Sequence, residues 1–163
     1  MGTDDRESLA GAWTQLQVVL GIFPRTDTLV GALLAIDTAM IGFFFSRWPD
    51  ASHSTPAMVV VTVVYALCAG FAIIDIYRCA FPNVEGDGTS LVFFRSIAKF
   101  DSYRGYSEKY SSVGDRQLAT QVLEQVWRNS KILAAKFDRL KSAMKWLLIS
   151  VVPWIIFFII SAK

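Results

Sequence analysis

Three long apolar stretches dominate this sequence, and they limit the chain to folds that a lipid bilayer can accommodate. They lie at Leu29–Ser46, Ala57–Ile74 and Trp146–Ala162, and Asp37 is the only charged residue among them. A helix needs about 20 mostly apolar residues to cross a hydrocarbon core of roughly 30 Å. Because only a helix satisfies its backbone hydrogen bonds within one such segment, the sequence predicts an all-α integral membrane protein with three transmembrane helices.

The segment before the first stretch predicts an amphipathic helix rather than a fourth span. Its apolar residues recur every three or four positions, as Leu9, Trp13, Leu16, Leu20 and Phe23. The run is too short to span and contains Thr and Gln. Pro24 is expected to break or kink this helix, because proline removes a helical hydrogen bond. Thr26 or Asp27 can then cap the next helix.

A long cytoplasmic helix is predicted to start at Asp115 and to continue into the last span, because no Gly or Pro interrupts the sequence before Pro153. Its apolar stripe comprises Leu118, Val122, Val126, Leu133, Phe137, Leu140 and Met144. A stripe of that length needs a partner, and the N-terminal helix is one candidate. Since a helix over Ser8–Phe23 is too short to cover the whole stripe, we also expect a homo-oligomer in which Val126 and Leu133 contact other copies.

Four segments follow from this pattern: an N-terminal amphipathic cytoplasmic helix (1–26), a transmembrane hairpin (27–80), a cytoplasmic helical sensor and assembly region (81–145) and a third transmembrane helix (146–163). Segment 81–145 holds most of the Lys and Arg residues. Since loops rich in these residues stay in the cytoplasm, we expect a cytoplasmic N-terminus. The short connection at 47–56 and the C-terminal Lys163 then lie on the outer side.

Catalytic and metal-binding residues are not predicted. The single histidine, His53, lies in the short outer connection, and no Cys–His, Ser–His–Asp or paired-His pattern is present. Cys68 and Cys79 are separated by about 16 Å of helix, which is too far for a disulfide. The Gly-rich stretch at 86–89 lacks the GK[ST] ending of a phosphate loop and is interpreted as a turn. The sequence therefore argues against an enzyme.

Asp37 is the most unusual residue of the predicted spans, because an ionised group at that depth costs at least about 2.5 kcal/mol. It should face other helices or water. One interpretation is a carboxylate that lines or gates a pore, and the other is a packing carboxylate that bonds across helices. Counting depth along the spans places Tyr65 and Trp154 near its level, so both are candidate bonding partners within an intramembrane polar site.

Short motifs follow one another in a fixed order along nearly the whole chain. The first span reads DTLVGALLAID from Asp27 to Asp37, and the second span, FFRSIA at 93–98 and a helix around Tyr106 come after it. The last helix carries Gln121, then NSKI at 129–132 and Lys136. In this order the chain resembles the small membrane effectors of Pycsar antiphage systems and, more loosely, the membrane effectors of CBASS-type defence.

The resemblance implies a protein of the bacterial inner membrane, with its outer loops in the periplasm. In such systems a partner cyclase detects phage and makes cyclic CMP, cyclic UMP or another cyclic nucleotide. The effector then impairs the membrane and the infected cell dies. The resemblance therefore implies an antiviral defence effector that responds to a cyclic nucleotide, with no other cofactor and no nucleic acid as partner.

If the chain senses the nucleotide directly, cytoplasmic side chains must hold a phosphate, a base edge and an aromatic face. The candidates for phosphate and for stacking or base contacts are Arg95, Lys99, Tyr103, Arg128, Asn129 and Lys136, with Phe94 as a second stacking residue. Arginine suits bidentate phosphate recognition, so Arg95 and Arg128 come first. The alternative is that these charges are solvated or touch anionic lipid heads.

Two other functions compatible with the sequence need no nucleotide. One is an oligomeric membrane channel or scaffold subunit that a protein partner controls, and the other is an auxiliary subunit of a transporter. Both would place the lipid bilayer and other chains, rather than a small ligand, in contact with this protein. Stabilisation of the purified protein by a cyclic nucleotide would separate the effector from both alternatives.

Overall fold

The computed structural model describes residues 3–48, 55–82 and 90–161, and these residues form five helices and no strand. The helices are α1 (Thr3–Ser46), α2 (Pro56–Ala80), α3 (Phe94–Ile97), α4 (Tyr103–Ser111) and α5 (Asp115–Ser161). Three of them, α1, α2 and α5, are long and apolar enough to cross a membrane. The predicted all-α membrane fold is therefore confirmed. His53, the Gly-rich stretch at 86–89 and Lys163 lie outside the described residues.

Helix α1 corrects the predicted boundary between an N-terminal helix and the first span. It runs unbroken for 44 residues and contains Pro24 in its interior, so neither Thr26 nor Asp27 caps a new helix. Pro24 cannot donate the usual bond to the Leu20 carbonyl. The flanking turns keep their packing, with Leu16 and Val30 both buried. Tertiary packing on both sides of the proline therefore outweighs its local cost.

Helix α2 has a clear local start signal. Thr55 precedes it in an extended conformation, and its side-chain oxygen accepts a hydrogen bond from the Met58 backbone N–H at 3.4 Å. Pro56 follows at the first helical turn, where its missing N–H costs nothing. These two residues fix where the second span begins.

Helix α5 confirms the predicted long helix that continues into the last span. It extends over 47 residues from Asp115 to Ser161 and contains Pro153. One element therefore joins the charged segment at its start to the apolar stretch at its end.

The chain divides into two compact units. Unit 1 comprises residues 1–24 and 83–134, and unit 2 comprises residues 25–82 and 135–163. In unit 1, Ala12, Leu16 and Val122 form the core, with Leu9, Val92 and Val126 packed against them. The N-terminal part of α1 thus packs against the apolar stripe of α5. This confirms the first of the two expectations for that stripe.

The second expectation for that stripe, that Val126 and Leu133 meet other copies, is wrong for these two residues. Val126 packs against the unit 1 core, and only 7% of the Leu133 surface is exposed. The reason is that α1 continues through Pro24 and packs on α5. The segment after residue 90 packs on α5 as well. Val126 and Leu133 are therefore packed within a single chain, whereas Phe137 and Met144 of the stripe are 43% and 47% exposed.

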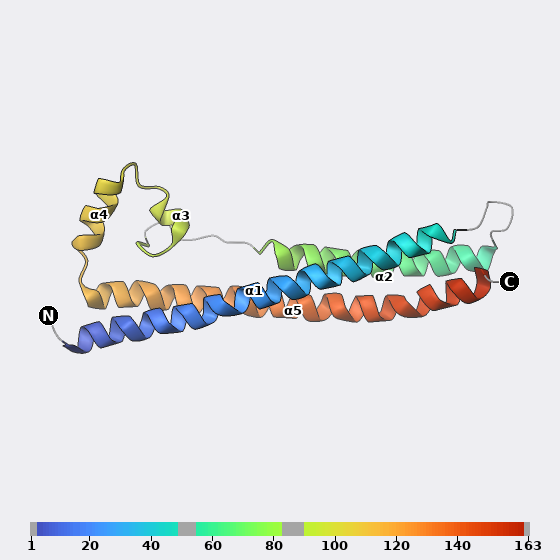
Figure 1. Ribbon diagram of the computed structural model, residues 1–163, viewed down its shortest axis with the longest axis horizontal. Coiled ribbons are helices and arrows are strands. Elements are labelled where there is room, and N and C mark those ends of the chain that lie inside the picture. Colours follow the sequence, from blue (N-terminus) through green and yellow to red (C-terminus); the bar gives the residue numbers. More distant parts are fainter. Residues whose placement is uncertain (1–2, 49–54, 83–89, 162–163) are drawn as a thin grey trace. The chain divides into compact units, whose positions relative to one another are not determined.

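In unit 2 the helices α1, α2 and α5 lie side by side (Figure 1) around two apolar clusters. The first cluster contains Val30, Ile76, Cys79, Leu140 and Ala143. The second contains Phe44, Tyr65, Ala69 and Phe157, with the Phe44 ring 4.6 Å from the Tyr65 ring and 4.1 Å from the Phe157 ring. Large apolar side chains such as Val60, Leu67 and Leu148 point outward, as expected for surfaces that contact lipid.

Two ion pairs connect the three long helices of unit 2. Lys136 of α5 pairs with Asp27 of α1, and Arg139 of α5 pairs with Asp75 of α2 at 3.4 Å. Lys136 and Arg139 are almost one turn apart on α5, so the two ion pairs connect α5 to α1 and to α2 at nearly the same height. The Cys79 thiol also donates to the Lys136 carbonyl at 3.3 Å.

Candidate functional site

The candidate sensor site of unit 1 is built where the segment before α3 packs on α5. The Leu91 N–H donates to Gln121 Oε1 at 2.8 Å, and the Tyr106 hydroxyl donates to the Leu91 carbonyl at 3.2 Å. Ser90 Oγ accepts from the N–H groups of Val92 and Phe93, both at 3.2 Å. These hydrogen bonds engage the backbone N–H groups that lie just before α3 begins.

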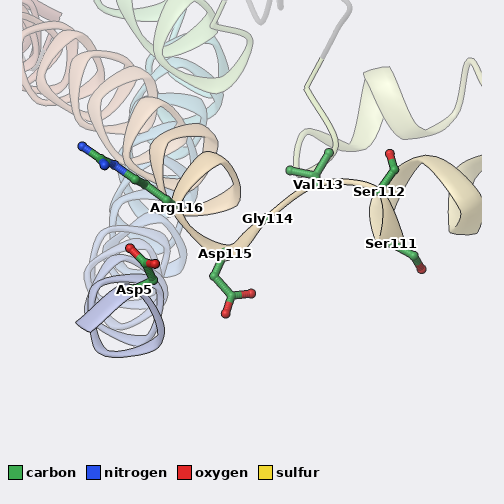
Figure 2. Close-up of a pocket in the computed structure, with 7 residues that line it drawn as sticks. All are labelled: Asp5, Ser111, Ser112, Val113, Gly114, Asp115 and Arg116. Carbon is green, nitrogen blue, oxygen red and sulfur yellow. The ribbon is translucent and has the colours of Figure 1, made fainter. Parts of the chain in front are cut away.

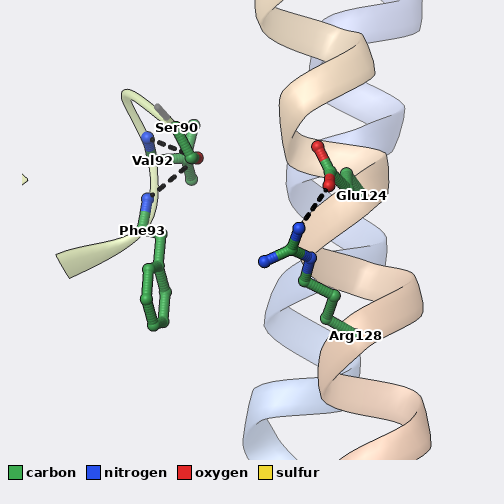
Figure 3. A network of polar contacts seen from close by, with 5 residues as sticks. All are labelled: Ser90, Val92, Phe93, Glu124 and Arg128. Atoms are coloured by element: carbon green, nitrogen blue, oxygen red, sulfur yellow. Dashed lines mark hydrogen bonds and ion pairs between the residues drawn. The ribbon is translucent and has the colours of Figure 1, made fainter. Parts of the chain in front are cut away.

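Arg95 follows this turn directly on α3, whereas Arg128, the other predicted arginine, lies on α5. Figure 3 shows the Arg128 guanidinium on the side of α5 that faces Phe93, with Glu124 one turn away. Arg128 Nη2 pairs with Glu124 Oε1 at 2.7 Å, and 24% of the Arg128 side chain is exposed. A half-buried arginine beside an aromatic ring matches the chemistry that a phosphate-bearing ligand with a planar base requires.

Two buried polar groups in unit 1 have no hydrogen-bond partner in the part of the chain that the structure describes. They are Gln125 Nε2 on α5 and Ser96 Oγ on α3, with 5% and 2% of their residue surfaces exposed. A buried donor without a partner costs about 1–3 kcal/mol. Such groups are retained where a ligand or an ordered water satisfies them.

The other predicted ligand residues lie at different positions. Arg95, Lys99 and Tyr103 are exposed, and Tyr103 is 83% exposed. Asn129 Nδ2 donates to the Gln125 carbonyl at 2.8 Å, which is a bond within α5. Arg128 and Asn129 are consecutive residues of α5, and each bonds to a residue one turn earlier on the same helix.

Lys136 belongs to unit 2, not to the unit that contains the other five candidates. Only 5% of its side chain is exposed, and its ammonium is engaged by Asp27. Lys136 therefore connects α5 to α1 and is not part of an open phosphate site.

A hollow of about 470 Å³ opens at the junction of α4 and α5 (Figure 2), lined by Asp5, Ser111, Ser112, Val113, Gly114, Asp115 and Arg116. Figure 2 shows the two carboxylates and the single guanidinium on its walls. The two carboxylates are offset by Arg116 and by Arg6, whose Nε lies 3.9 Å from Asp115 Oδ2, so this hollow has no excess of positive charge for a phosphate. The Arg128 region is therefore the better candidate for an anionic ligand.

The intramembrane polar residues lie inside unit 2. Asp37 has no exposed surface, and both carboxyl oxygens are buried without a partner among the described residues, as is the Tyr65 hydroxyl. Trp154 Nε1 donates instead to the Met40 carbonyl at 3.3 Å. Asp37 thus faces the helices, as predicted, but it bonds to neither of the two suggested partners. Asp37 lies two helical turns before Phe44 on the same face of α1.

No group of three His, Cys, Asp or Glu side chains gathers within residues 3–48, 55–82 and 90–161. A family profile described as the Pycsar effector protein domain matches residues 11–161. That range includes α2 and α5 in full, α1 from Gly11 onward and the whole Arg128 region. The chain belongs to the Pycsar effector family. It is thus an effector of antiphage defence and a membrane protein.

Neither the curated proteins nor the solved structures contain a match to this Pycsar effector. Its site must therefore be derived from its own residues. Sequence reasoning assigned no ligand role to Gln121, which bonds to the Leu91 N–H, or to Gln125, whose amide is buried one turn further along α5. A signal was available, since Gln125 lies one turn after Val122 and one before Asn129 on the inner stripe, where an amide has to find a partner.

Proposed function

We propose that this Pycsar effector binds a cyclic nucleotide, such as cyclic CMP or cyclic UMP, and responds by impairing the bacterial inner membrane. The protein acts without catalysis, as a homo-oligomer in the bilayer, with unit 1 in the cytoplasm. The infected cell dies before phage is released. The nucleotide comes from a partner cyclase, so the binding site must face the cytoplasm.

One observation carries this proposal: Arg128 and the unpartnered Gln125 amide lie on the same helix, and Arg128 is on the side that faces Phe93. A cyclic phosphate can accept hydrogen bonds from Arg128 in place of the Glu124 carboxylate, because the phosphate and the carboxylate are both anionic acceptors. A pyrimidine base can stack on Phe93 and accept from the Gln125 amide. The ligand would thus satisfy a donor that folding alone leaves without a partner.

The response is coupled to the membrane through α5, which contains both Arg128 and the apolar stretch up to Ser161. A ligand that draws Arg128 toward the Ser90–Phe93 turn would shift the start of this helix relative to that turn. The same helix contacts Asp27 and Asp75 through its two ion pairs. Loosening these ties would allow the three spans to separate and expose Asp37 to water.

The test is calorimetry of purified protein with cyclic CMP, cyclic UMP and cyclic AMP, together with phage survival of cells that carry the cyclase. Arg128→Ala should lower affinity at least about tenfold, the effect of losing roughly 1.4 kcal/mol of binding. Gln125→Leu should weaken binding while preserving the fold. Arg95→Ala tests the other predicted arginine. The matched control is Arg104→Ala, since Arg104 is exposed and pairs with Glu108 inside α4. Normal affinity in both Arg128→Ala and Gln125→Leu would remove this site.

A second function, a channel or scaffold subunit that a protein partner controls, is favoured by one feature. Phe94 and Tyr103 are 63% and 83% exposed in unit 1, and exposed aromatic residues are frequent in protein interfaces. This alternative predicts no heat signal with any cyclic nucleotide and a loss of phage protection in Tyr103→Ser.

A further inference from the structure

Helices α1 and α5 run parallel and in step within unit 1. Arg6 Nε of α1 lies 3.9 Å from Asp115 Oδ2 of α5. Ala12 and Leu16 then share one core cluster with Val122, about two turns further along both helices. Because both helices rise about 1.5 Å per residue, residues at equal distances from this ion pair lie at equal heights.

Each of these helices carries a second apolar face that the unit 1 core does not cover. On α1, Trp13 and Leu20 are 36% and 45% exposed, two turns apart on one side. On α5, Leu123 and Trp127 are 46% and 58% exposed, one turn apart, with Lys131 Nζ 4.2 Å from the Trp127 ring centre. Both faces repeat at the spacing of helix–helix seams.

The two uncovered faces lie at the same height. Trp13 is level with about Val122, and Leu20 with about Asn129, so the α1 face spans the height at which Leu123 and Trp127 lie on α5. The two faces therefore match in height and in apolar character.

We propose that these faces meet between neighbouring copies: Trp13 and Leu20 of one copy pack against Leu123 and Trp127 of the next. This inference rests on the homo-oligomer proposed above. Copies anchored in one membrane share an orientation, and a rotation about the direction of the helices leaves heights unchanged. Such a head-to-tail contact repeats around a closed ring.

The contact is tested by disulfide formation between two differently tagged copies, each with one new cysteine at an exposed position. Gly21→Cys and Ser130→Cys lie at equal height beside the two faces, and a side chain at Gly21 meets nothing within 4 Å. Both native cysteines are buried and are left in place. Oxidation in isolated membranes should give a dimer that contains both tags. The matched control pairs Gly21→Cys with Thr120→Cys, about 15 Å lower on α5, and should give none.

A second measurement uses Leu20→Ser and Val18→Ser, two exposed positions about 200° apart around α1. We expect Leu20→Ser to reduce the oligomer mass measured by light scattering in detergent, whereas Val18→Ser leaves it unchanged. An oligomer without the mixed dimer would overturn this contact and leave the proposed assembly intact. A monomeric wild-type protein would overturn both.

Discussion

The ammonium group of Lys136 on α5 is buried against the carboxylate of Asp27 on α1. Only 5% of the Lys136 side chain is exposed, compared with 57% of Asp27. The neighbouring pair has the opposite asymmetry, because Arg139 is 50% exposed and Asp75 is 10% exposed. The consequence of losing either carboxylate therefore depends on whether water can reach the cation that remains.

Asp27→Asn should destabilise the protein by about 3–5 kcal/mol, because it leaves a buried ammonium without its counter-charge. Asp75→Asn should cost under about 1 kcal/mol, since Arg139 can be solvated. Thermal unfolding in detergent measures both. The double variant Asp27→Asn/Lys136→Met should recover most of the loss, and its failure to do so would contradict the assignment.

Asp37→Leu should fold at least as stably as the wild type, because an apolar side chain replaces a buried carboxyl group whose oxygens have no partner among the described residues. We expect the same variant to reduce phage protection if Asp37 is hydrated during the response. Asp37→Asn is the control of similar shape. Stable folding together with full protection in Asp37→Leu would leave Asp37 with a packing role only.

Tyr65→Phe should leave the melting temperature unchanged or raise it, since the Tyr65 hydroxyl is buried without a partner in the described structure. Tyr65→Ala should cost about 3–5 kcal/mol, because it also removes the ring that stacks on Phe44. A loss of more than about 1 kcal/mol in Tyr65→Phe would reveal a hydroxyl partner supplied by another chain.

Leu16→Ala should destabilise unit 1 by about 2–5 kcal/mol, since Leu16 is 5% exposed in the core with Ala12 and Val122. Val18→Ala, two residues further along the same helix and 63% exposed, should change stability by less than about 0.5 kcal/mol. Limited proteolysis of the N-terminal part of α1 reports the difference. Equal protease resistance of the two variants would show that this part of α1 is not docked.

The orientation in the membrane is tested by cysteine labelling in a background that lacks the two native cysteines. Asp50→Cys should react with an impermeant reagent on intact cells, because the predicted topology puts residues 47–56 in the periplasm. Tyr110→Cys on α4 should react only after the cells are permeabilised. Labelling of position 110 from outside would reverse the proposed topology.

The three spans and the long last helix could be predicted from the sequence alone. A lipid bilayer accepts few backbone structures, so apolar length is enough to identify the transmembrane helices. The same reasoning placed Asp37 on an inward face, because a carboxyl group at that depth has to avoid lipid. Local solvent constraints decide these features, and a single sequence contains them.

Only the tertiary structure decided how the helices continue and which side chains meet. Pro24 reads as a helix end, yet α1 passes through it because packing on both sides outweighs one lost bond. Lys136 reads as a ligand for phosphate, yet Asp27 of another helix engages it. The buried Gln125 amide became a candidate contact only when its neighbours were known. Pairings between residues far apart in the chain depend on the register of packed helices, which no local pattern specifies.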